Sequence, residues 1–226
     1  VGGILRTLLR QLRGGGDWGY SVAEKFREDV RCALDVKTRG LSPQRAMEVV
    51  RAMTPRSTLA TCDAGASRLL VVQKWESYGP REFLPSNGLG SMGFAIPGAL
   101  AAKLAHPDRP VFAFTGDGGF LMAVAELQTS VKENLPITVV VLDDEEIGLI
   151  RVKQEINQID RYGVGIGGID WERLGRGFGA NGIVVSTEAD LQSAITASLA
   201  STKTNLIAVK IDGSCYVDQF NALREL

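Results

Sequence analysis

Two acidic turns follow two successive apolar runs of the chain. Gly116-Asp117-Gly118-Gly119 comes after the run 110–115, and Asp143-Asp144-Glu145-Glu146 comes after the run 137–142. If these runs are adjacent parallel strands, their carboxyl ends meet at one edge of a sheet, where ligands bind in open α/β folds. Carboxylates flanked by glycine amides suit a hard divalent cation bound to a diphosphate. The sequence therefore predicts a metal and diphosphate site at this edge.

The cation expected at such a site is Mg²⁺, which takes octahedral oxygen ligands and usually accepts some of them from phosphate. Asp117, Asp144, a backbone carbonyl near Glu146, two diphosphate oxygens and a water would fill that shell. Either aspartate alone is more simply explained as a turn or N-cap residue. The pair, with its surrounding glycines, favours a ligand site.

Two expected helices begin beside these carboxylates. Gly116-Asp117-Gly118 precedes a helix predicted at 121–133, and Ile147 and Gly148 open a helix predicted at 147–157. Backbone amides at the amino end of a helix favour bound anions. We therefore expect both helix starts to contribute donors to the same ligand.

Strand and helix patterns alternate along the rest of the chain. Strands are predicted at 57–62, 110–115, 137–142, 182–185 and 206–211, with Phe83-Leu84 as a short further candidate, and the last of these strands is expected to close the domain. Helices are predicted at 66–75, 121–133, 147–157, 170–178 and 187–200, after Ser42-Pro43 and after the glycine-rich turn 87–93. This alternation predicts an α/β fold: an open, mostly parallel sheet of about six strands with helices on both faces.

The first forty residues differ from this pattern. Apolar residues at helical spacing predict a helix over 4–13, Gly14-Gly15-Gly16 interrupts the chain, and 18–37 is a charged stretch with a sparse apolar face. We interpret 1–40 as an N-terminal helical appendage or linker. The chain starts Val1-Gly2-Gly3-Ile4, without an initiator methionine or a signal-peptide pattern, so we expect it to be a piece of a longer protein.

Composition limits the classes of partner. The 226 residues carry 25 basic and 26 acidic side chains, a net charge of −1, which gives no electrostatic reason to bind nucleic acid or an anionic membrane. With 45% hydrophobic residues the chain suits a folded domain, yet no apolar run approaches a membrane span. Cys32, Cys62 and Cys215 form no CxxC pair and indicate a reducing, cytoplasmic setting.

Three other patterns are weaker candidates for a site. Gly163–Gly168 fits G-x-G-x-x-G but follows a polar run, so a loop is the simpler interpretation. Gly88–Gly93 also fits and precedes a helix, which leaves a Rossmann-type nicotinamide-dependent oxidoreductase as an alternative function, although the strand before it is very short. His106, the single histidine, is placed as a surface helix C-cap.

Four motifs together resemble the acetolactate synthase/pyruvate decarboxylase superfamily, whose members use thiamine diphosphate and Mg²⁺. They are Gly116-Asp117-Gly118 through Asp144, Ser86–Gly93, Pro107–Val111 and Glu126–Thr129. The similarity runs over about 42–212 and is closest to acetolactate-synthase-like members. It implies that 41–226 is the C-terminal, diphosphate-binding domain of such an enzyme and that 1–40 is the end of the preceding domain with its linker.

The resemblance implies a role for each matching position. Asp117 and Asp144 resemble the side-chain ligands of Mg²⁺, and Glu146 resembles the backbone-carbonyl ligand. Gly65, Ala66, Gly118 and Gly119 would face the diphosphate, beside Gly116, Ile147 and Gly148 at the two helix starts. Gly90 and Met92 match positions whose backbone holds the aminopyrimidine, and the Met92 side chain matches the apolar wedge that bends the cofactor.

Two positions depart from the family pattern. The usual residue at position 144 is Asn, whereas this chain has Asp; we expect metal binding to be retained and to weaken at lower pH. Acetolactate synthases carry a substrate-selecting Trp where this chain has Lys153. The identity of the 2-oxo acid is therefore left open. The Lys153 side chain would face either an anionic group of the substrate or solvent.

The resemblance also implies what this chain does not carry. In the family a glutamate of the N-terminal, pyrimidine-binding domain protonates the cofactor, and a partner subunit supplies that domain. We therefore expect no catalytic residue in this chain, a homo-oligomeric enzyme acting on a 2-oxo acid, and no activity from the chain alone. A non-catalytic assembly module that kept the fold is a further alternative.

Overall fold

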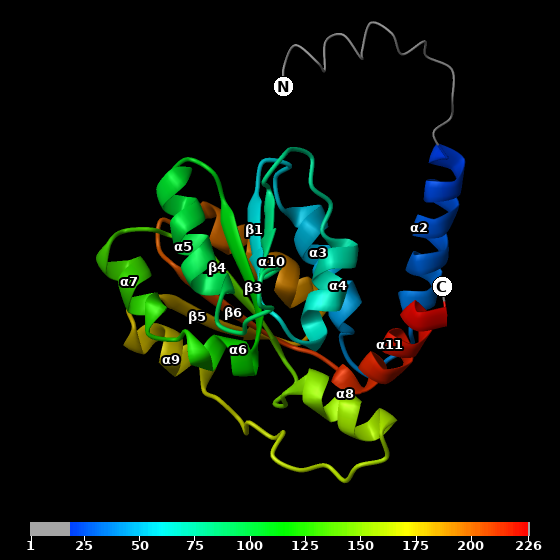
Figure 1. Cartoon of the computed structure of the whole chain (residues 1–226). Coiled ribbons are helices and arrows are strands. Elements are labelled where there is room, and N and C mark those ends of the chain that lie inside the picture. Colours follow the sequence, from blue (N-terminus) through cyan, green and yellow to red (C-terminus); the bar gives the residue numbers. More distant parts are fainter. Residues whose placement is uncertain (1–18, 226) are drawn as a thin grey trace, which may run out of the picture.

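The computed structural model describes residues 19–225, and the expected helix 4–13 and Trp18 lie outside them. Six strands form one sheet in the order β2-β1-β3-β4-β6-β5, and each of their five pairings is parallel (Figure 1). The strands are β1 Leu59–Cys62, β2 Phe83–Pro85, β3 Val111–Gly116, β4 Thr138–Asp143, β5 Asn181–Val185 and β6 Asn205–Lys210. The predicted open, parallel α/β fold is confirmed.

Helices cover both faces of the sheet. The helices are α2 Tyr20–Leu34, α3 Pro43–Met53, α4 Ala66–Lys74, α5 Ala95–Ala105, α6 Asp117–Met122, α7 Glu126–Lys132, α8 Gly148–Ile156, α9 Trp171–Gly177, α10 Glu188–Ala200 and α11 Tyr216–Glu225. One core cluster joins α3, α4 and α10 to the sheet, and a second joins α5, α6, α7 and α9 to the other face. Because both faces are covered, the central strands are continuous apolar runs, and every residue of β4 is buried.

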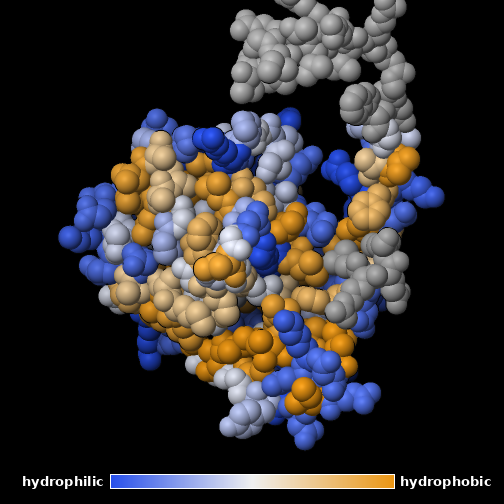
Figure 2. All heavy atoms as spheres, viewed as in Figure 1, coloured by the Kyte–Doolittle hydropathy of each residue, from blue (hydrophilic) through white to orange (hydrophobic). Residues whose placement is uncertain are grey.

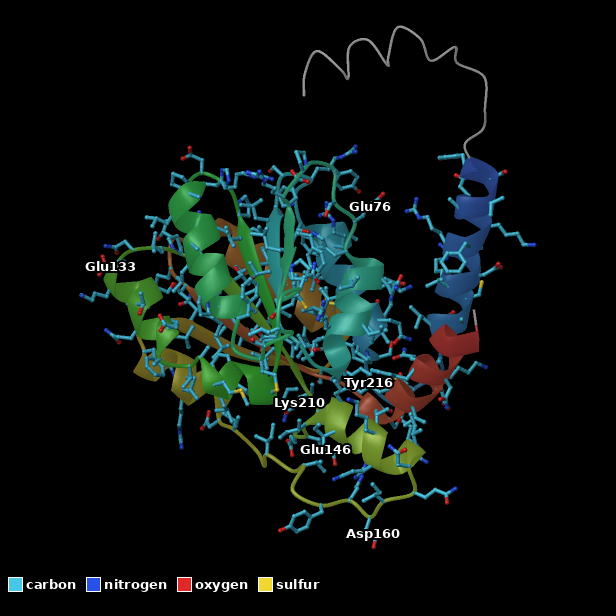
Figure 3. All side chains as sticks on the ribbon, viewed as in Figure 1. Glu76, Glu133, Glu146, Asp160, Lys210 and Tyr216 are labelled. Atoms are coloured by element: carbon cyan, nitrogen blue, oxygen red, sulfur yellow. The ribbon has the colours of Figure 1, made fainter. Side chains whose placement is uncertain are left out.

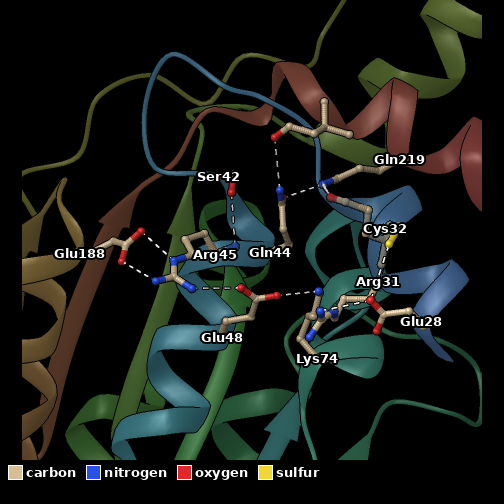
Figure 4. Close-up of polar contacts among 12 residues, drawn as sticks. Glu28, Arg31, Cys32, Ser42, Gln44, Arg45, Glu48, Lys74, Glu188 and Gln219 are labelled. Atoms are coloured by element: carbon tan, nitrogen blue, oxygen red, sulfur yellow. Dashed lines mark hydrogen bonds and ion pairs between the residues drawn. The ribbon is translucent and has the colours of Figure 1, made fainter. Parts of the chain in front are cut away.

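The amino end of α3 forms as its sequence predicts. Ser42 caps the helix by accepting a hydrogen bond from the Arg45 amide at 3.3 Å, and Pro43 occupies the first helical position. The Arg45 guanidinium then pairs with Glu188 of α10 at 2.7 Å, as Figure 4 shows. These contacts fix α3 beside α10 on one face of the sheet.

The prediction that strand 206–211 ends the domain is wrong. A short 3₁₀ turn, Gly213–Cys215, and helix α11 follow β6. Helix α11 packs against α2 through a third apolar cluster that contains Leu34 and Tyr216. Buried Gln219 of α11 also donates to Gln44 Oε1 at 2.6 Å and to the Leu34 carbonyl at 3.1 Å. Helix α11 was not predicted, although Tyr216, Val217, Phe220 and Leu223 are apolar residues at helical spacing.

Two further boundaries differ from the sequence prediction. The single helix expected at 121–133 is two helices, α6 and α7, separated by a turn at 123–125. Helix α6 starts at Asp117, directly after β3, because Gly118 and Gly119 let the chain turn tightly against its neighbours. The short candidate at 83–84 is a genuine edge strand, β2, which pairs with β1.

The interpretations of His106 as a helix C-cap and of Gly163–Gly168 as a loop are confirmed. His106 is exposed and caps the end of α5. Trp75 and Trp171 are buried packing residues, and Gly163–Gly168 lies in a loop. All three cysteines are free thiols, of which Cys62 and Cys215 are buried. Within residues 19–225, no helix has the length and apolar character needed to cross a membrane.

Candidate functional site

One cavity lies at the carboxyl edge of the sheet, with a volume of about 160 Å³. Every residue predicted for the site lines it: Gly65, Ala66, Gly90, Met92, Gly116, Asp117, Gly118, Gly119, Asp144, Glu146, Ile147 and Gly148. Residues from the ends of β3 and β4, from the turn after β1 and from the helices that follow these strands thus meet at one place. The cavity is lined more by apolar than by polar atoms, so a charged group within it is only partly solvated.

The two predicted metal ligands come from adjacent strands. Gly116 of β3 pairs in register with Leu142 of β4, so Asp117 and Asp144 each follow directly beyond the paired ends. One Asp117 oxygen accepts a hydrogen bond from the Gly118 amide at 2.7 Å. The other Asp117 oxygen, Oδ2, is buried without a hydrogen-bond partner, and Asp144 Oδ2 is in the same condition. Two buried oxygens with free lone pairs are what an oxygen-binding cation requires.

The electrostatics of this pair favour added positive charge. Burial, followed by repulsion from the Asp144 carboxylate, raises the pKa of Asp117 to about 7. Burial also raises the pKa of Asp144 to about 6, although the nearby Arg151 guanidinium acts in the opposite direction. Both carboxylates therefore bind protons more tightly than ordinary aspartates when no cation is present.

Glu146 is held by its side chain and its backbone. Its carboxylate forms ion pairs with Arg151 Nε at 2.8 Å and Arg161 at 3.0 Å, the first too poorly aligned to be a hydrogen bond. Its backbone forms an antiparallel bridge with Gly165. The arginines therefore engage the carboxylate. Figure 3 shows Glu146 near Lys210 and Tyr216, where β4 and β6 end and α8 begins.

Glycines leave room at the centre of the site. A Cβ at Gly118 would lie 3.2 Å from both Met92 Cε and Ile166 Cδ1, so these apolar side chains converge over Gly118. Gly90 has φ of +65° and Gly93 has φ of +77°, a left-handed conformation that favours glycine. The turn before α5 can therefore bring Met92 to the cavity only with glycine at these positions.

Tyr216 and Gly213 are among the residues near the site that were not predicted. Tyr216, at the start of α11, lines the cavity, and burial followed by the Asp144 charge raises the pKa of its hydroxyl. Gly213 packs directly against the Asp144 carboxylate. Both lie after β6, where the sequence predicted no further element. The motif Asp212-Gly213-Ser214, an acidic turn after the last strand, was the available clue.

Replacing Gly213 tests how tightly Asp144 is packed. A Cβ at Gly213 would overlap the Asp144 carboxylate, so we expect Gly213→Ala to lower the free energy of unfolding by about 1–3 kcal/mol. Thermal unfolding measures this change. Gly177→Ala is the matched control, because a Cβ there meets nothing within 4 Å. Equal stability of the two variants would contradict the packing of Gly213 on Asp144.

Lys153, the second departure from the family pattern, lies on α8 with an exposed side chain and does not line the cavity. A larger groove, of about 990 Å³, runs between α2 and α4 past Val30 and Trp75. It contains none of the predicted site residues, and its charged rim carries both signs. The chemistry predicted from the sequence therefore belongs to the smaller cavity.

Comparison with known proteins identifies the family. Residues 63–209 match the family model "Thiamine pyrophosphate enzyme, C-terminal TPP binding domain". The chain is 32% identical over 210 residues to the acetolactate synthase isozyme 2 large subunit of Escherichia coli, covering 92% of this chain and 38% of that protein. It is 30% identical over 202 residues to the isozyme 1 large subunit, covering 87% of this chain and 35% of that protein.

Solved structures agree with this assignment. A thiamine diphosphate-dependent 4-hydroxybenzoylformate decarboxylase of Rhodococcus jostii superposes with a TM-score of 0.73 at 26% identity, covering 79% of this chain and 34% of that one. A benzoylformate decarboxylase of Polynucleobacter necessarius gives 0.70 at 26% identity, covering 78% and 34%.

The fold and these matches define the chain as a thiamine pyrophosphate-binding α/β domain. It belongs to the thiamine pyrophosphate enzyme family, as a C-terminal TPP-binding domain similar to that of acetolactate synthase large subunits. The chain spans about a third of the length of these relatives. The nicotinamide-dependent alternative is not favoured by these matches.

Proposed function

We propose that this chain is the cofactor-binding part of a thiamine-diphosphate- and Mg²⁺-dependent enzyme that decarboxylates or ligates 2-oxo acids. The observation that carries the proposal is the pair of buried oxygens without hydrogen-bond partners, Asp117 Oδ2 and Asp144 Oδ2, at the ends of adjacent strands. An apolar protein interior disfavours two such groups unless a cation completes them. Thiamine diphosphate supplies an electron sink for the carbanion left when a 2-oxo acid loses CO₂.

In this proposal the chain's residues hold the cofactor and the cation. Asp117 and Asp144 ligate Mg²⁺ through their side chains, and Glu146 does so through its backbone carbonyl. The Glu146 carboxylate forms ion pairs with Arg151 and Arg161. Because these arginines hold the side chain, we assign the metal ligand to the backbone carbonyl. The glycines around the cavity let the backbone approach the diphosphate closely.

The remaining predicted residues would contact the organic part of the cofactor and its diphosphate. Gly90 and Met92 would hold the aminopyrimidine through their backbone, and the Met92 side chain would be the apolar wedge that bends the cofactor. Gly65, Ala66, Gly118 and Gly119 face the diphosphate, with Gly116, Ile147 and Gly148 beside them. Their common position around one cavity supports these roles.

The size of the cavity is consistent with one half of a binding site that a second domain completes. Its volume of about 160 Å³ is below the roughly 300 Å³ at which pockets for drug-sized ligands begin. Figure 2 shows apolar surface over α6 and α8 beside it, where Leu121, Met122 and Ile150 are 41–64% exposed. We propose that a pyrimidine-binding domain of a partner subunit covers this face and supplies the catalytic glutamate in a homo-oligomer.

The domain boundaries follow from the same proposal. Residues 41–226 form the diphosphate-binding domain, and 1–40 are the end of the preceding domain with its linker. The free cysteines support a cytoplasmic location.

The chain by itself is expected to be inactive. Without a partner domain no glutamate protonates the cofactor, so we expect no turnover of pyruvate by the purified chain. A coupled assay for CO₂ release measures this. The control adds a pyrimidine-binding domain from the same protein, which should restore activity; turnover by the chain alone would contradict the half-site.

Titration calorimetry tests cofactor binding itself. Thiamine diphosphate is titrated into the chain with and without Mg²⁺. We expect weak binding that requires Mg²⁺, because the cation joins the two carboxylates to the diphosphate. Binding that is as strong in the presence of a chelator would contradict the proposed role of the metal.

A further inference from the structure

Asp63, the residue after β1, is a buried carboxylate that the site description leaves without a role. Its side chain is 2% exposed. Oδ1 accepts a hydrogen bond from the Ala95 amide at 2.6 Å. Oδ2 accepts from the Gly93 amide at 3.0 Å and from the Thr115 hydroxyl at 2.6 Å. One carboxylate thus binds three donors from three different segments.

Two of these three segments, the turn before α5 and the end of β3, also line the cavity. Gly93 ends the turn that carries Gly90 and Met92, Ala95 begins α5, and Thr115 precedes Gly116 at the end of β3. The carboxylate also lies against Gly119 of α6, where a Cβ would overlap it. Asp63 therefore joins the aminopyrimidine side of the predicted site to its diphosphate side.

Asp63 itself does not line the cavity, so any effect on a ligand passes through its partners. Other hydrogen bonds also tie this region to β1 and the residue after Asp63. The Ala64 amide donates to the Ser91 carbonyl at 3.3 Å, the Ser86 amide donates to the Cys62 carbonyl at 3.0 Å, and the Thr61 hydroxyl donates to the Ala95 carbonyl at 2.7 Å. The Asp63 hydrogen bonds are the ones that also reach β3.

We propose that Asp63 is a positioning residue, which holds the turn 88–93 in place relative to Gly118 so that both sides of the cofactor meet a preformed site. The part of this proposal that concerns the cofactor rests on the proposed function. A carboxylate is required because it accepts at both oxygens. The isosteric amide of Asp63→Asn turns an NH₂ group toward donors on one side and cannot satisfy all three.

Hydrogen exchange tests the hold on the turn without any cofactor. In the full chain, we expect the segment 87–95 to exchange about tenfold faster in Asp63→Asn than in the unaltered protein. Ser130→Ala is the matched control: it removes a buried hydroxyl that donates to the Leu135 carbonyl at 2.7 Å, away from the cavity. It should leave the segment 87–95 unchanged. Unchanged exchange in Asp63→Asn would overturn the proposal.

Thr115→Val provides a second variant, which keeps the carboxylate and removes one of its donors. We expect faster exchange in the same segment, by less than in Asp63→Asn. If Asp63→Asn does not fold, this variant decides the matter: normal exchange at 87–95 in folded Thr115→Val would contradict the proposal.

Cofactor titration then separates positioning from general stability. With Mg²⁺ present, we expect Asp63→Asn to bind thiamine diphosphate about tenfold more weakly, while Ser130→Ala stays within about twofold of the unaltered protein. Equal weakening in both variants would show that Asp63 acts only through stability. If the unaltered protein binds no cofactor, the proposed function fails, and the exchange measurement still judges whether Asp63 holds the turn.

Discussion

Replacing Asp117 with alanine is expected to abolish Mg²⁺-dependent binding of thiamine diphosphate. In the proposed site Asp117 gives the cation one of its two carboxylates, and its Oδ2 has no other partner. Removing one member of a buried charge pair costs enough to weaken binding by about a hundredfold or more. Calorimetric titration of thiamine diphosphate in the presence of Mg²⁺ into Asp117→Ala and into the unaltered protein measures the loss of affinity.

Glu145→Gln is the matched control for this substitution. It removes the same charge next to Asp144, but Glu145 pairs with Lys210 at 2.7 Å and does not line the cavity. We expect nearly unaltered cofactor binding. The Asp117→Ala protein should also be at least as stable as the original without metal, since a buried carboxylate with one oxygen lacking a hydrogen-bond partner is removed. Loss of stability together with binding would indicate a structural role for Asp117.

The stability of the metal-free protein should fall as pH rises from about 4 to 7. The pKa values of Asp117 and Asp144, about 7 and about 6, lie above their ordinary value of 3.8. The folded state therefore binds more protons than the unfolded state in this window, and deprotonation favours unfolding. Since one pKa unit corresponds to about 1.4 kcal/mol, the two shifts together would lower the free energy of unfolding by at most about 7 kcal/mol, and by less because the two carboxylates interact.

Mg²⁺ and cofactor should reverse this dependence. The cation binds the deprotonated carboxylates, so its affinity should rise from pH 5.5 to pH 8, an interval chosen to span both pKa values, and binding should release protons. Melting temperatures across this range, with and without Mg²⁺ and cofactor, measure both effects. Asp144→Asn, which restores the residue usual in the family, should show a smaller decline without metal. A decline as large as in the original protein would contradict the assignment to Asp144.

The place of the candidate site could be predicted because local sequence determines it. A strand followed by Gly116-Asp117-Gly118 and another followed by Asp143-Asp144 predict that the carboxylates lie at one sheet edge, and β3 and β4 are indeed neighbours. The parallel sheet could be predicted for the same reason: apolar runs such as Val139–Leu142 alternate with helices. The family resemblance supplied Gly90 and Met92, which local physics alone does not single out.

The parts that could not be predicted depend on contacts distant in sequence. The local sequence does not single out Asp63, whose hydrogen bonds form only when Ala95 and Thr115 are brought to it, 32 and 52 residues away. Tyr216 and Gly213 approach Asp144 because β6 lies beside β4. The start of α6 at Asp117, four residues before the predicted start at 121, reflects tight packing at Gly119 that no periodicity reveals.

The measurement that tests the central claim most directly is a crystal structure of the full chain with thiamine diphosphate and Mn²⁺ in place of Mg²⁺. Anomalous scattering locates Mn²⁺ unambiguously, and Mn²⁺ accepts similar oxygen ligands. We predict one cation between the Asp117 and Asp144 carboxylates and the Glu146 carbonyl, bound to two diphosphate oxygens. A bound cofactor with no cation there at saturating Mn²⁺, or a cation held elsewhere, would contradict the account.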